Sequence, residues 1–209
     1  QTMTYSSALY TPETKDLADA QKAKYAALAR ESAIAPSHNV LEIGCGWGAI
    51  AEMGAGVLGA CMTGVTLSHE QLAWAQQRLH NAGLQADLRL QDYRDIRDEP
   101  FDAIVSIEML EAVGQAYWPQ YFATLNRLLK PGGRLVYATC SLLQAENEQV
   151  VSAFDAAHPS WRPIPAEQVL ARQGVAQASD LCAGDGRFMR LWPHRHGTDG
   201  FFASIWEAA

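Results

Sequence analysis

A glycine-rich turn that directly follows an apolar segment constrains the fold more than any other feature of this sequence. The segment reads HNVLEIGCGWG, and the Ala-rich, helix-prone stretch AIAEMGAGVLG comes after it. A short apolar run that breaks into glycines before a helix is typical of a buried parallel strand in a β-loop-α unit. Ligands of such sheets bind at the carboxyl ends of the strands, which is where these glycines lie.

The alternation of strand-like and helix-like segments continues along the chain. CMTGVTL, ADLRLQ, FDAIVSIEML and RLVYAT predict further strands, and HEQLAWAQQRLHNAG and AYWPQYFATLNRLLK predict helices. Ser68 is expected to cap the first of these helices, with Gln71 at the capping-box position. An amphipathic helix is predicted at 14–33, before the sheet. These features predict an α/β fold of the Rossmann-like type, a mainly parallel sheet with helices on both faces.

The pattern changes after Cys140. A helix is expected at about 144–157 and a short one near 167–172, and then RFMRLWP and GFFASIWE predict a β-hairpin. The 209 residues suit one domain, and no linker is long enough to separate two. We expect an amino-terminal helical segment at 1–36, a cofactor-binding half at 37–133 and a sheet-completing half at 134–209.

Composition excludes several classes of function. The net charge of −7 disfavours binding to nucleic acid over the whole surface. There is no apolar run of the ~20 residues that cross a bilayer, and QTMTYSSALY lacks the pattern of a signal peptide, so we expect a soluble, cytoplasmic protein. The four cysteines form no CxxC pair, which favours reduced thiols over a zinc site or disulfides.

The spacing of the glycines indicates the cofactor. Gly44, Gly46 and Gly48 follow a G-x-G-x-G pattern and not the G-x-G-x-x-G of dinucleotide-binding turns, where a pyrophosphate meets a helix. A compact nucleoside without phosphates fits better, which points to S-adenosylmethionine. Glu42, at the end of the strand, is suited to accept hydrogen bonds from a ligand amine. The alternative is a merely tight strand-to-helix turn.

A set of motifs from Met3 to about Gly133 resembles the cyclopropane fatty acid synthase and mycolic acid cyclopropane synthase family. They are MTYSSALY, AQKAKYAALAR, VLEIGCGWG, TGVTLSHEQLAWAQQRL, LRLQDYRDI, FDAIVSIEMLEAVG and YWPQYFATLNRLLKPGG. The resemblance implies that S-adenosylmethionine is surrounded by Tyr5, Ser6, Gly44, Cys45, Gly46, Thr66, Leu67, Gln71, Asp92, Tyr93 and Ile107. Glu42 and Gly48 of the glycine turn complete the predicted cofactor site. Asp92 is suited to accept from the adenine amine, and Tyr93 is suited to lie against the ring.

The last third of the chain resembles another family. RLVYATCSLLQAENEQVVSAF, AEQVLARQGVA and RFMRLWPHRHGTDGFFASIWE are similar to the carboxyl end of the bacterial ribosomal RNA 5-methylcytosine methyltransferases of the Fmu or Sun family. The two patterns meet at PGGRL, which suggests a chimera, natural or engineered. A natural lineage that drifted into both patterns is the alternative. Both families imply one seven-stranded sheet in the order 3-2-1-4-5-7-6, with the last strand antiparallel.

The catalytic groups that the first resemblance implies are incomplete. Cyclopropane synthases hold a bicarbonate base, and Glu111 matches their Glu after strand four. Ala112 and Ala138 stand where that family has histidines, and Ser7 stands where it often has Cys. We therefore expect native cyclopropanation to be weak or lost, since a general base contributes ~10²–10⁴-fold.

The second resemblance makes Cys140 a candidate nucleophile. Thr139-Cys140-Ser141 matches that family's motif, but its Asp-x-Pro-Cys loop is replaced by SIEMLEAVG. No basic residue lies close in sequence to stabilise a thiolate. The favoured interpretation is a small buried residue at a strand end.

A cluster of basic residues near the carboxyl end comprises Arg187, Arg190, His194, Arg195 and His196. We interpret this cluster as a solvated face with residual RNA affinity. No metal site is expected. Three functions stay open: a lipid or small-molecule methyltransferase, an RNA cytosine methyltransferase that uses Cys140, and an S-adenosylmethionine-binding protein without turnover. The expected partner is a lipid or small-molecule acceptor, and RNA is not favoured.

Overall fold

The computed structural model describes most of the chain as two compact units. The described residues are 3, 8, 10, 15–31, 34–172, 174–183, 185–197 and 200–208, without the side chains of 27–31 and 111. The first unit is Gln1–Lys130 and the second is Pro131–Ala209. Their division falls in the PGG turn, close to the boundary between the two halves that the sequence predicts.

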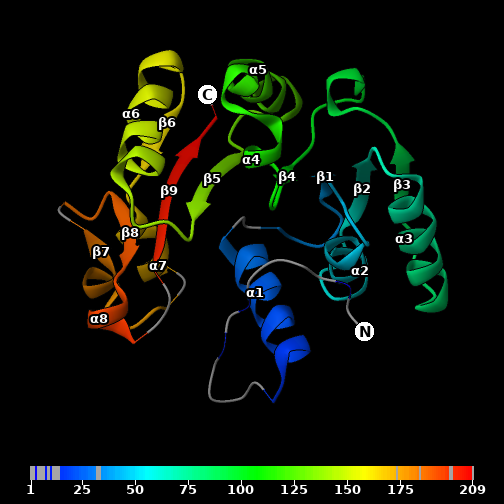
Figure 1. Cartoon of the computed structure of the whole chain (residues 1–209), viewed down its shortest axis with the longest axis horizontal. Helices are drawn as coiled ribbons and strands as arrows, with labels where there is room; N and C mark the ends of the chain where they lie inside the picture. Colours follow the sequence, from blue (N-terminus) through cyan, green and yellow to red (C-terminus); the bar gives the residue numbers. More distant parts are fainter. Residues whose placement is uncertain are drawn as a thin grey trace. The chain divides into compact units, whose positions relative to one another are not determined.

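The first unit contains the predicted succession of strands and helices (Figure 1). Its elements are α1 (Leu17–Glu31), β1 (Asn39–Ile43), α2 (Ala49–Gly56), β2 (Cys61–Thr66), α3 (His69–Asn81), β3 (Asp87–Leu90), η1 (Tyr93–Asp95), β4 (Ala103–Val105), α4 (Leu110–Val113), η2 (Gln115–Tyr117) and α5 (Trp118–Leu128).

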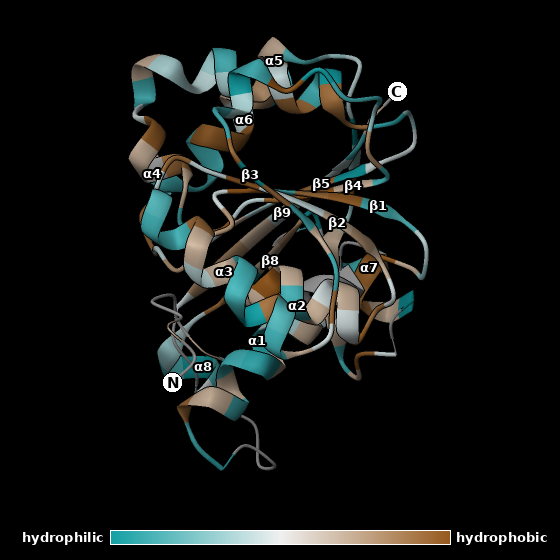
Figure 2. Cartoon of the chain, turned by 90° about the vertical axis from the view of Figure 1, so that its right-hand side faces the viewer, coloured by the Kyte–Doolittle hydropathy of each residue, from teal (hydrophilic) through white to brown (hydrophobic). Residues whose placement is uncertain are grey.

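The sheet of the first unit is parallel and has the order β3-β2-β1-β4. Val40, Leu41 and Ile43 of β1 are at most 1% exposed, as expected for a central strand covered on both faces. Figure 2 shows α2 and α3 on one face of this sheet and α5 on the other. The chain steps from β1 to β2 and β3 on one side and returns to β4 on the other. Strand order therefore reverses between β1 and β4, and a crevice forms at their carboxyl ends.

The second unit has its own, mainly antiparallel sheet. Its elements are β5 (Arg134–Thr139), η3 (Gln144–Glu146), α6 (Glu148–Ala157), β6 (Arg162–Ile164), α7 (Ala166–Arg172), η4 (Ala178–Leu181), β7 (Cys182–Ala183), β8 (Phe188–Leu191), α8 (Pro193–His196) and β9 (Phe201–Glu207). The order is β5-β9-β8-β7, and β6 also pairs with β9. The predicted hairpin is confirmed in β8 and β9, which pair antiparallel.

The predicted single seven-stranded sheet is wrong, because the strands of the described residues form a four-stranded and a five-stranded sheet. The partial orders 3-2-1-4 and 5-7-6 are each present, the second as β5-β9-β8. The predicted strands four and five, which are β4 and β5, do not pair with each other. β4 offers only three residues for pairing, and β5 is the edge strand of its own sheet. So short a strand gives few ladder hydrogen bonds to a new neighbour.

The segment FDAIVSIEML is a strand over a shorter stretch than its apolar character suggests. β4 ends at Val105, Glu108 has a left-handed backbone with φ 55°, and α4 begins at Leu110. A left-handed residue is incompatible with an extended strand. The residues after Val105 therefore line the crevice instead of lengthening the sheet.

Two expectations from composition can be compared with the fold. All four cysteines are free, as their spacing predicts. No helix in the described part of the chain is both long enough and apolar enough to cross a membrane.

Candidate functional site

The glycine turn after β1 is held against the end of β2 by its backbone. The N–H groups of Gly44 and Cys45 both donate to the carbonyl oxygen of Val65, each at 3.0 Å. Gly44, Gly46 and Gly48 have positive φ values of 79°, 51° and 78°. Such a backbone is easily reached only by glycine, and it lets a ligand approach the main chain closely. Gly48 then caps α2 in the left-handed conformation.

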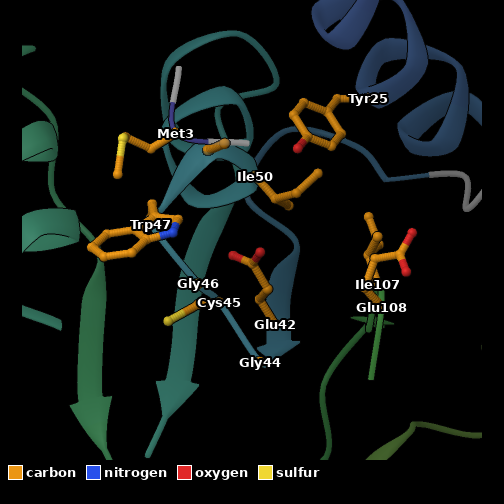
Figure 3. A pocket seen from close by; sticks show the side chains of 11 residues that line it. Met3, Tyr25, Glu42, Gly44, Cys45, Gly46, Trp47, Ile50, Ile107 and Glu108 are labelled. Atoms are coloured by element: carbon orange, nitrogen blue, oxygen red, sulfur yellow. The ribbon is translucent and has the colours of Figure 1, made fainter. Parts of the chain in front are cut away.

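A pocket lies at this turn, where the carboxyl ends of β1 and β4 meet. Figure 3 shows its side chains; the lining residues are Met3, Tyr25, Glu42, Gly44, Cys45, Gly46, Trp47, Ala49, Ile50, Ile107 and Glu108. Five of them are predicted cofactor residues, namely Glu42, Gly44, Cys45, Gly46 and Ile107. The crevice predicted from strand order and the glycine turn predicted from sequence therefore coincide.

Glu42 is the most unusual group of this pocket. Its side chain is 5% exposed, and Oε2 has no hydrogen-bond partner among the described residues. Burial raises the pKa of Glu42 well above its ordinary value, although the backbone N–H of Ala51 and the charge of Arg78 oppose this. A buried carboxyl oxygen without a hydrogen-bond partner is costly. A ligand amine in the pocket would remove that cost, and this fits the ammonium group of S-adenosylmethionine.

Cys45 is unsuited to nucleophilic chemistry. It is buried, and burial together with the negative charge of Glu42 raises its pKa to about 12. A thiol with so high a pKa stays protonated at neutral pH. Its contribution to the site is its backbone, which forms part of the turn.

The predicted residues after β2 form a local hydrogen-bonded group outside that pocket. The Thr66 hydroxyl donates to Oε1 of Gln71 at 2.7 Å. Ser68 caps α3 and accepts from the N–H of Gln71 at 3.2 Å, so the predicted cap is confirmed. Leu67 is 72% exposed between them. The turn after β2 thus fixes the orientation of the Gln71 amide.

The predicted pair after β3 also has contacts within the first unit. Both carboxylate oxygens of Asp92 bind the guanidinium of Arg94, at 2.9 Å and 2.6 Å, and this hydrogen bonding lowers the pKa of Asp92. Tyr93 packs edge-to-face on Tyr121, with ring centroids 5.2 Å apart. An adenine amine at Asp92 would therefore share that carboxylate with Arg94.

Some residues that shape the site were not predicted from sequence. The Tyr121 hydroxyl lies 2.7 Å from Oγ of Ser106, which donates to the carbonyl oxygen of Ile43 at 3.2 Å. This chain connects α5 to the ends of β4 and β1. Tyr25 of α1 and Trp47 line the pocket, and Trp47 packs edge-to-face on Trp74. Tyr25 lies in the segment predicted as an amphipathic helix, and nothing in that pattern marked it as a pocket residue.

The catalytic candidates have different outcomes. Tyr5 and Ser6 lie outside the described residues, as does the side chain of Glu111. Cys140, in the second unit, is exposed, so its interpretation as a buried residue is wrong. The strand ends at Thr139, and Asn147 binds Thr139 and the carbonyl oxygen of Ser141. These bonds shape the loop without covering Cys140.

Two of the five basic residues near the carboxyl end, Arg187 and Arg190, are not part of a solvated face, whereas His194 and Arg195 are exposed. Arg190 is 6% exposed, forms an ion pair with Glu148 and lies over the rings of Trp192 and Phe202. Arg187 pairs with Asp155 at 3.5 Å. These two arginines have structural partners. The prediction of a solvated face is therefore wrong for Arg187 and Arg190.

Two family models match this chain. The family model described as mycolic acid cyclopropane synthetase matches residues 1–158 of the 209. The chain belongs to this family. A second model, 16S rRNA methyltransferase RsmB/F, matches residues 117–207 and overlaps the first over 117–158. Both predicted resemblances are therefore found, and a chimeric origin stays a prediction.

The chain is similar in sequence to several proteins whose names describe lipid modification. It is 43% identical over 142 residues to the tuberculostearic acid methyltransferase UfaA1 of Mycobacterium tuberculosis, covering 64% of this chain and 33% of that protein. It is 43% identical over 131 residues to the cyclopropane-fatty-acyl-phospholipid synthase of Escherichia coli K12, covering 63% and 33%. The chain thus spans about a third of the length of these relatives.

Solved structures show the same fold. Cyclopropane synthase MmaA2 from Mycobacterium tuberculosis has a TM-score of 0.66 at 19% identity, covering 100% of this chain and 90% of that one. NSun6 from Pyrococcus horikoshii has a TM-score of 0.62 at 20% identity, covering 88% and 51%. CmaA1, solved with SAH, has a TM-score of 0.61 at 24% identity, covering 85% and 55%. S-adenosylmethionine as the cofactor of the family, predicted from the sequence, is confirmed.

Proposed function

We propose that this chain is the catalytic part of an S-adenosylmethionine-dependent methyltransferase whose acceptor is a lipid. The observation that carries the cofactor assignment is Glu42, whose buried Oε2 lacks a partner and lines a pocket beside a glycine turn. The lipid acceptor is inferred from the relatives, which are named as methyltransferases and synthases of fatty acids and fatty-acyl phospholipids.

The cofactor supplies an electrophilic methyl group when it is bound. In this proposal Glu42 accepts from the ligand ammonium, and the turn of Gly44, Cys45, Gly46 and Gly48 lets the ligand lie against the backbone. The remaining proposed contacts orient the nucleoside and exclude water from it; they are Tyr5, Ser6, Thr66, Leu67, Gln71, Asp92, Tyr93 and Ile107. Orientation in a dry site is most of what methyl transfer requires of the protein.

We further propose that cyclopropanation itself is weak or lost. Glu111 is retained as a candidate catalytic residue, but Ala112 and Ala138 have no group that binds an anion. Without a held base, removal of a proton from a methylated acyl chain is slow. Transfer of a methyl group to an acceptor that needs no such base is compatible with the remaining residues.

A second candidate, RNA cytosine methylation, is favoured by one observation. Cys140 is exposed and directly follows β5, in the region that the 16S rRNA methyltransferase model matches. This also supports the proposal that the second unit derives from an RNA methyltransferase and was joined near Pro131. The absent Asp-x-Pro-Cys loop makes it the weaker candidate.

These proposals are tested by incubating the protein with labelled S-adenosylmethionine and separate acceptor pools. The pools are unsaturated phospholipid vesicles, ribosomal RNA and small metabolites. Label in the phospholipid pool supports lipid methylation, and label in RNA supports the second candidate. Gly46→Val should abolish transfer and binding, whereas Gly83→Val, also at a positive φ but with open space around it, should not. Binding without transfer to any pool would contradict a methyltransferase and leave a cofactor-binding protein.

A further inference from the structure

Glu108 has an unfavourable backbone conformation at the edge of the cofactor pocket. Its φ of 55° lies in the left-handed region. Glutamate rarely adopts this conformation, which is mostly left to glycine, asparagine and aspartate. Residues held in such conformations cluster at binding sites, where the surrounding structure fixes them.

This conformation places a carboxylate in the pocket. Glu108 lines the pocket together with Glu42, the first from the segment after β4 and the second from β1 (Figure 3). The side chain of Glu42 is buried, whereas Glu108 is exposed. The two acidic groups therefore line the same pocket from different segments and in different environments.

The two groups differ in the charge they bring to the pocket. Burial raises the pKa of Glu42 well above its ordinary value, so the empty protein holds it in the neutral form more readily. The side chain of Glu108 is exposed to solvent, and its negative charge acts on Lys24 of α1. Glu108 thus contributes negative charge to the lining of the pocket.

Lys24 of α1 opposes this charge. Its pKa is lowered by burial, and the negative charge of Glu108 raises it, which shows that the two side chains interact electrostatically. Its neighbour Tyr25 is 7% exposed and lines the pocket. Glu108 and Lys24 therefore both contribute to the charge near the pocket.

We propose that Glu108 is a specificity-determining residue that favours the cationic cofactor over its neutral product. This inference rests on the proposed cofactor site. S-adenosylmethionine has a sulfonium that its product S-adenosylhomocysteine lacks, and the two are otherwise alike in shape. A carboxylate at this position attracts the extra positive charge and gains nothing from the product. The product then leaves more readily after each transfer.

Calorimetric titration with two stable ligands tests this without turnover. Sinefungin carries an ammonium in place of the methylated sulfonium, and S-adenosylhomocysteine carries no charge there. The wild-type protein should bind sinefungin more tightly. Glu108→Gln should lower the ratio of the two affinities about tenfold, mainly by weakening sinefungin. Lys24→Met should change the ratio in the opposite direction, and added salt should reduce the ratio in the wild type.

Two further variants separate charge from backbone strain and from general effects. Glu108→Gly removes the charge and relieves the left-handed strain, so it should raise stability yet lower the affinity ratio as much as Glu108→Gln does. Glu99→Gln removes an exposed carboxylate outside the pocket and should leave the ratio unchanged. If both ligands bind but the Glu108 variants keep the wild-type ratio, the inference is wrong and the cofactor site stands. If neither ligand binds the wild type, the cofactor site itself is wrong.

Discussion

The side chain of Met109 lies against Gly44 so closely that a β-carbon added at Gly44 would come within 2.6 Å of Met109 Cγ. Gly44 directly follows β1, and Met109 follows β4 by four residues. The two strand ends therefore pack with no room for a side chain between them. This contact holds the two walls of the pocket, which carry Glu42 and Glu108, in a fixed relation.

Gly44→Ala should therefore destabilise the protein more than an ordinary glycine substitution. The left-handed backbone, with φ 79°, costs an alanine roughly 1–2 kcal/mol, and the overlap with Met109 adds roughly 1–3 kcal/mol. Urea unfolding measures the sum. The matched control is Gly83→Ala, where φ is 66° and nothing lies within 4 Å of the new β-carbon, so only the first cost applies. Adding Met109→Ala to Gly44→Ala should recover part of the loss; equal losses at the two glycines would contradict the contact.

Asp92→Ala should weaken binding of S-adenosylhomocysteine by about tenfold or less, because it removes one hydrogen-bonding group of about 0.5–1.5 kcal/mol. Gly46→Val should abolish binding, since it fills the site. Arg94→Ala is the control, because it removes the ion pair of Asp92 without removing the carboxylate. We expect Arg94→Ala to change stability little, because its guanidinium is half exposed and solvent screens its ion pair. An unchanged dissociation constant for Asp92→Ala would show that Asp92 makes no contact with the ligand.

The raised pKa of Glu42 predicts a pH-dependent stability. Below the ordinary carboxyl value of 4.5 both the folded and unfolded states hold the proton, and stability is full. As the pH rises, the unfolded chain ionises first, so stability falls until the pH reaches the raised folded value. Urea unfolding between about pH 5 and pH 8 should show the wild type losing stability relative to Glu42→Gln.

The control for Glu42 is Glu99→Gln, whose exposed side chain should give a curve parallel to that of the wild type. Parallel curves for Glu42→Gln and the wild type would mean that Glu42 ionises alike in both states. Saturating S-adenosylhomocysteine should flatten the wild-type dependence, because the ligand ammonium favours the ionised carboxylate.

Cys140 is not expected to act as an efficient nucleophile, although it is exposed. The segment after β4, where the RNA enzymes have their Asp-x-Pro-Cys loop, is SIEMLEAVG here and forms α4. Without that partner, attack on the cytosine ring lacks its acid and its release step. A ribosomal RNA fragment containing 5-fluorocytosine, incubated with S-adenosylmethionine, should form no covalent adduct that depends on Cys140. An adduct lost in Cys140→Ser would make RNA methylation the leading function.

Local features of the first unit followed from the sequence because their causes lie within a few residues. The turn at Gly44 and Gly46 needs positive φ, which glycine adopts freely, and the cap at Ser68 needs only a hydroxyl three residues before an N–H. The strands from Asn39 to Leu90 are marked by short apolar runs between helices. Each of these could be predicted without knowing what the segment packs against.

Other properties depend on groups that are distant in sequence, and the tertiary structure decided them. The pKa of Glu42 follows from burial among residues of several elements, and the exposure of Cys140 follows from where β5 ends and how Asn147 shapes the next loop. Strand pairing depends in the same way on which edges meet. The sequence predicted seven of the nine strands of the described residues, missed β6 and β7, and joined the seven into one sheet. Hydrophobic periodicity reports whether a segment is a strand, whereas its neighbour is chosen by non-local packing, and a pattern in one segment holds no information about that choice.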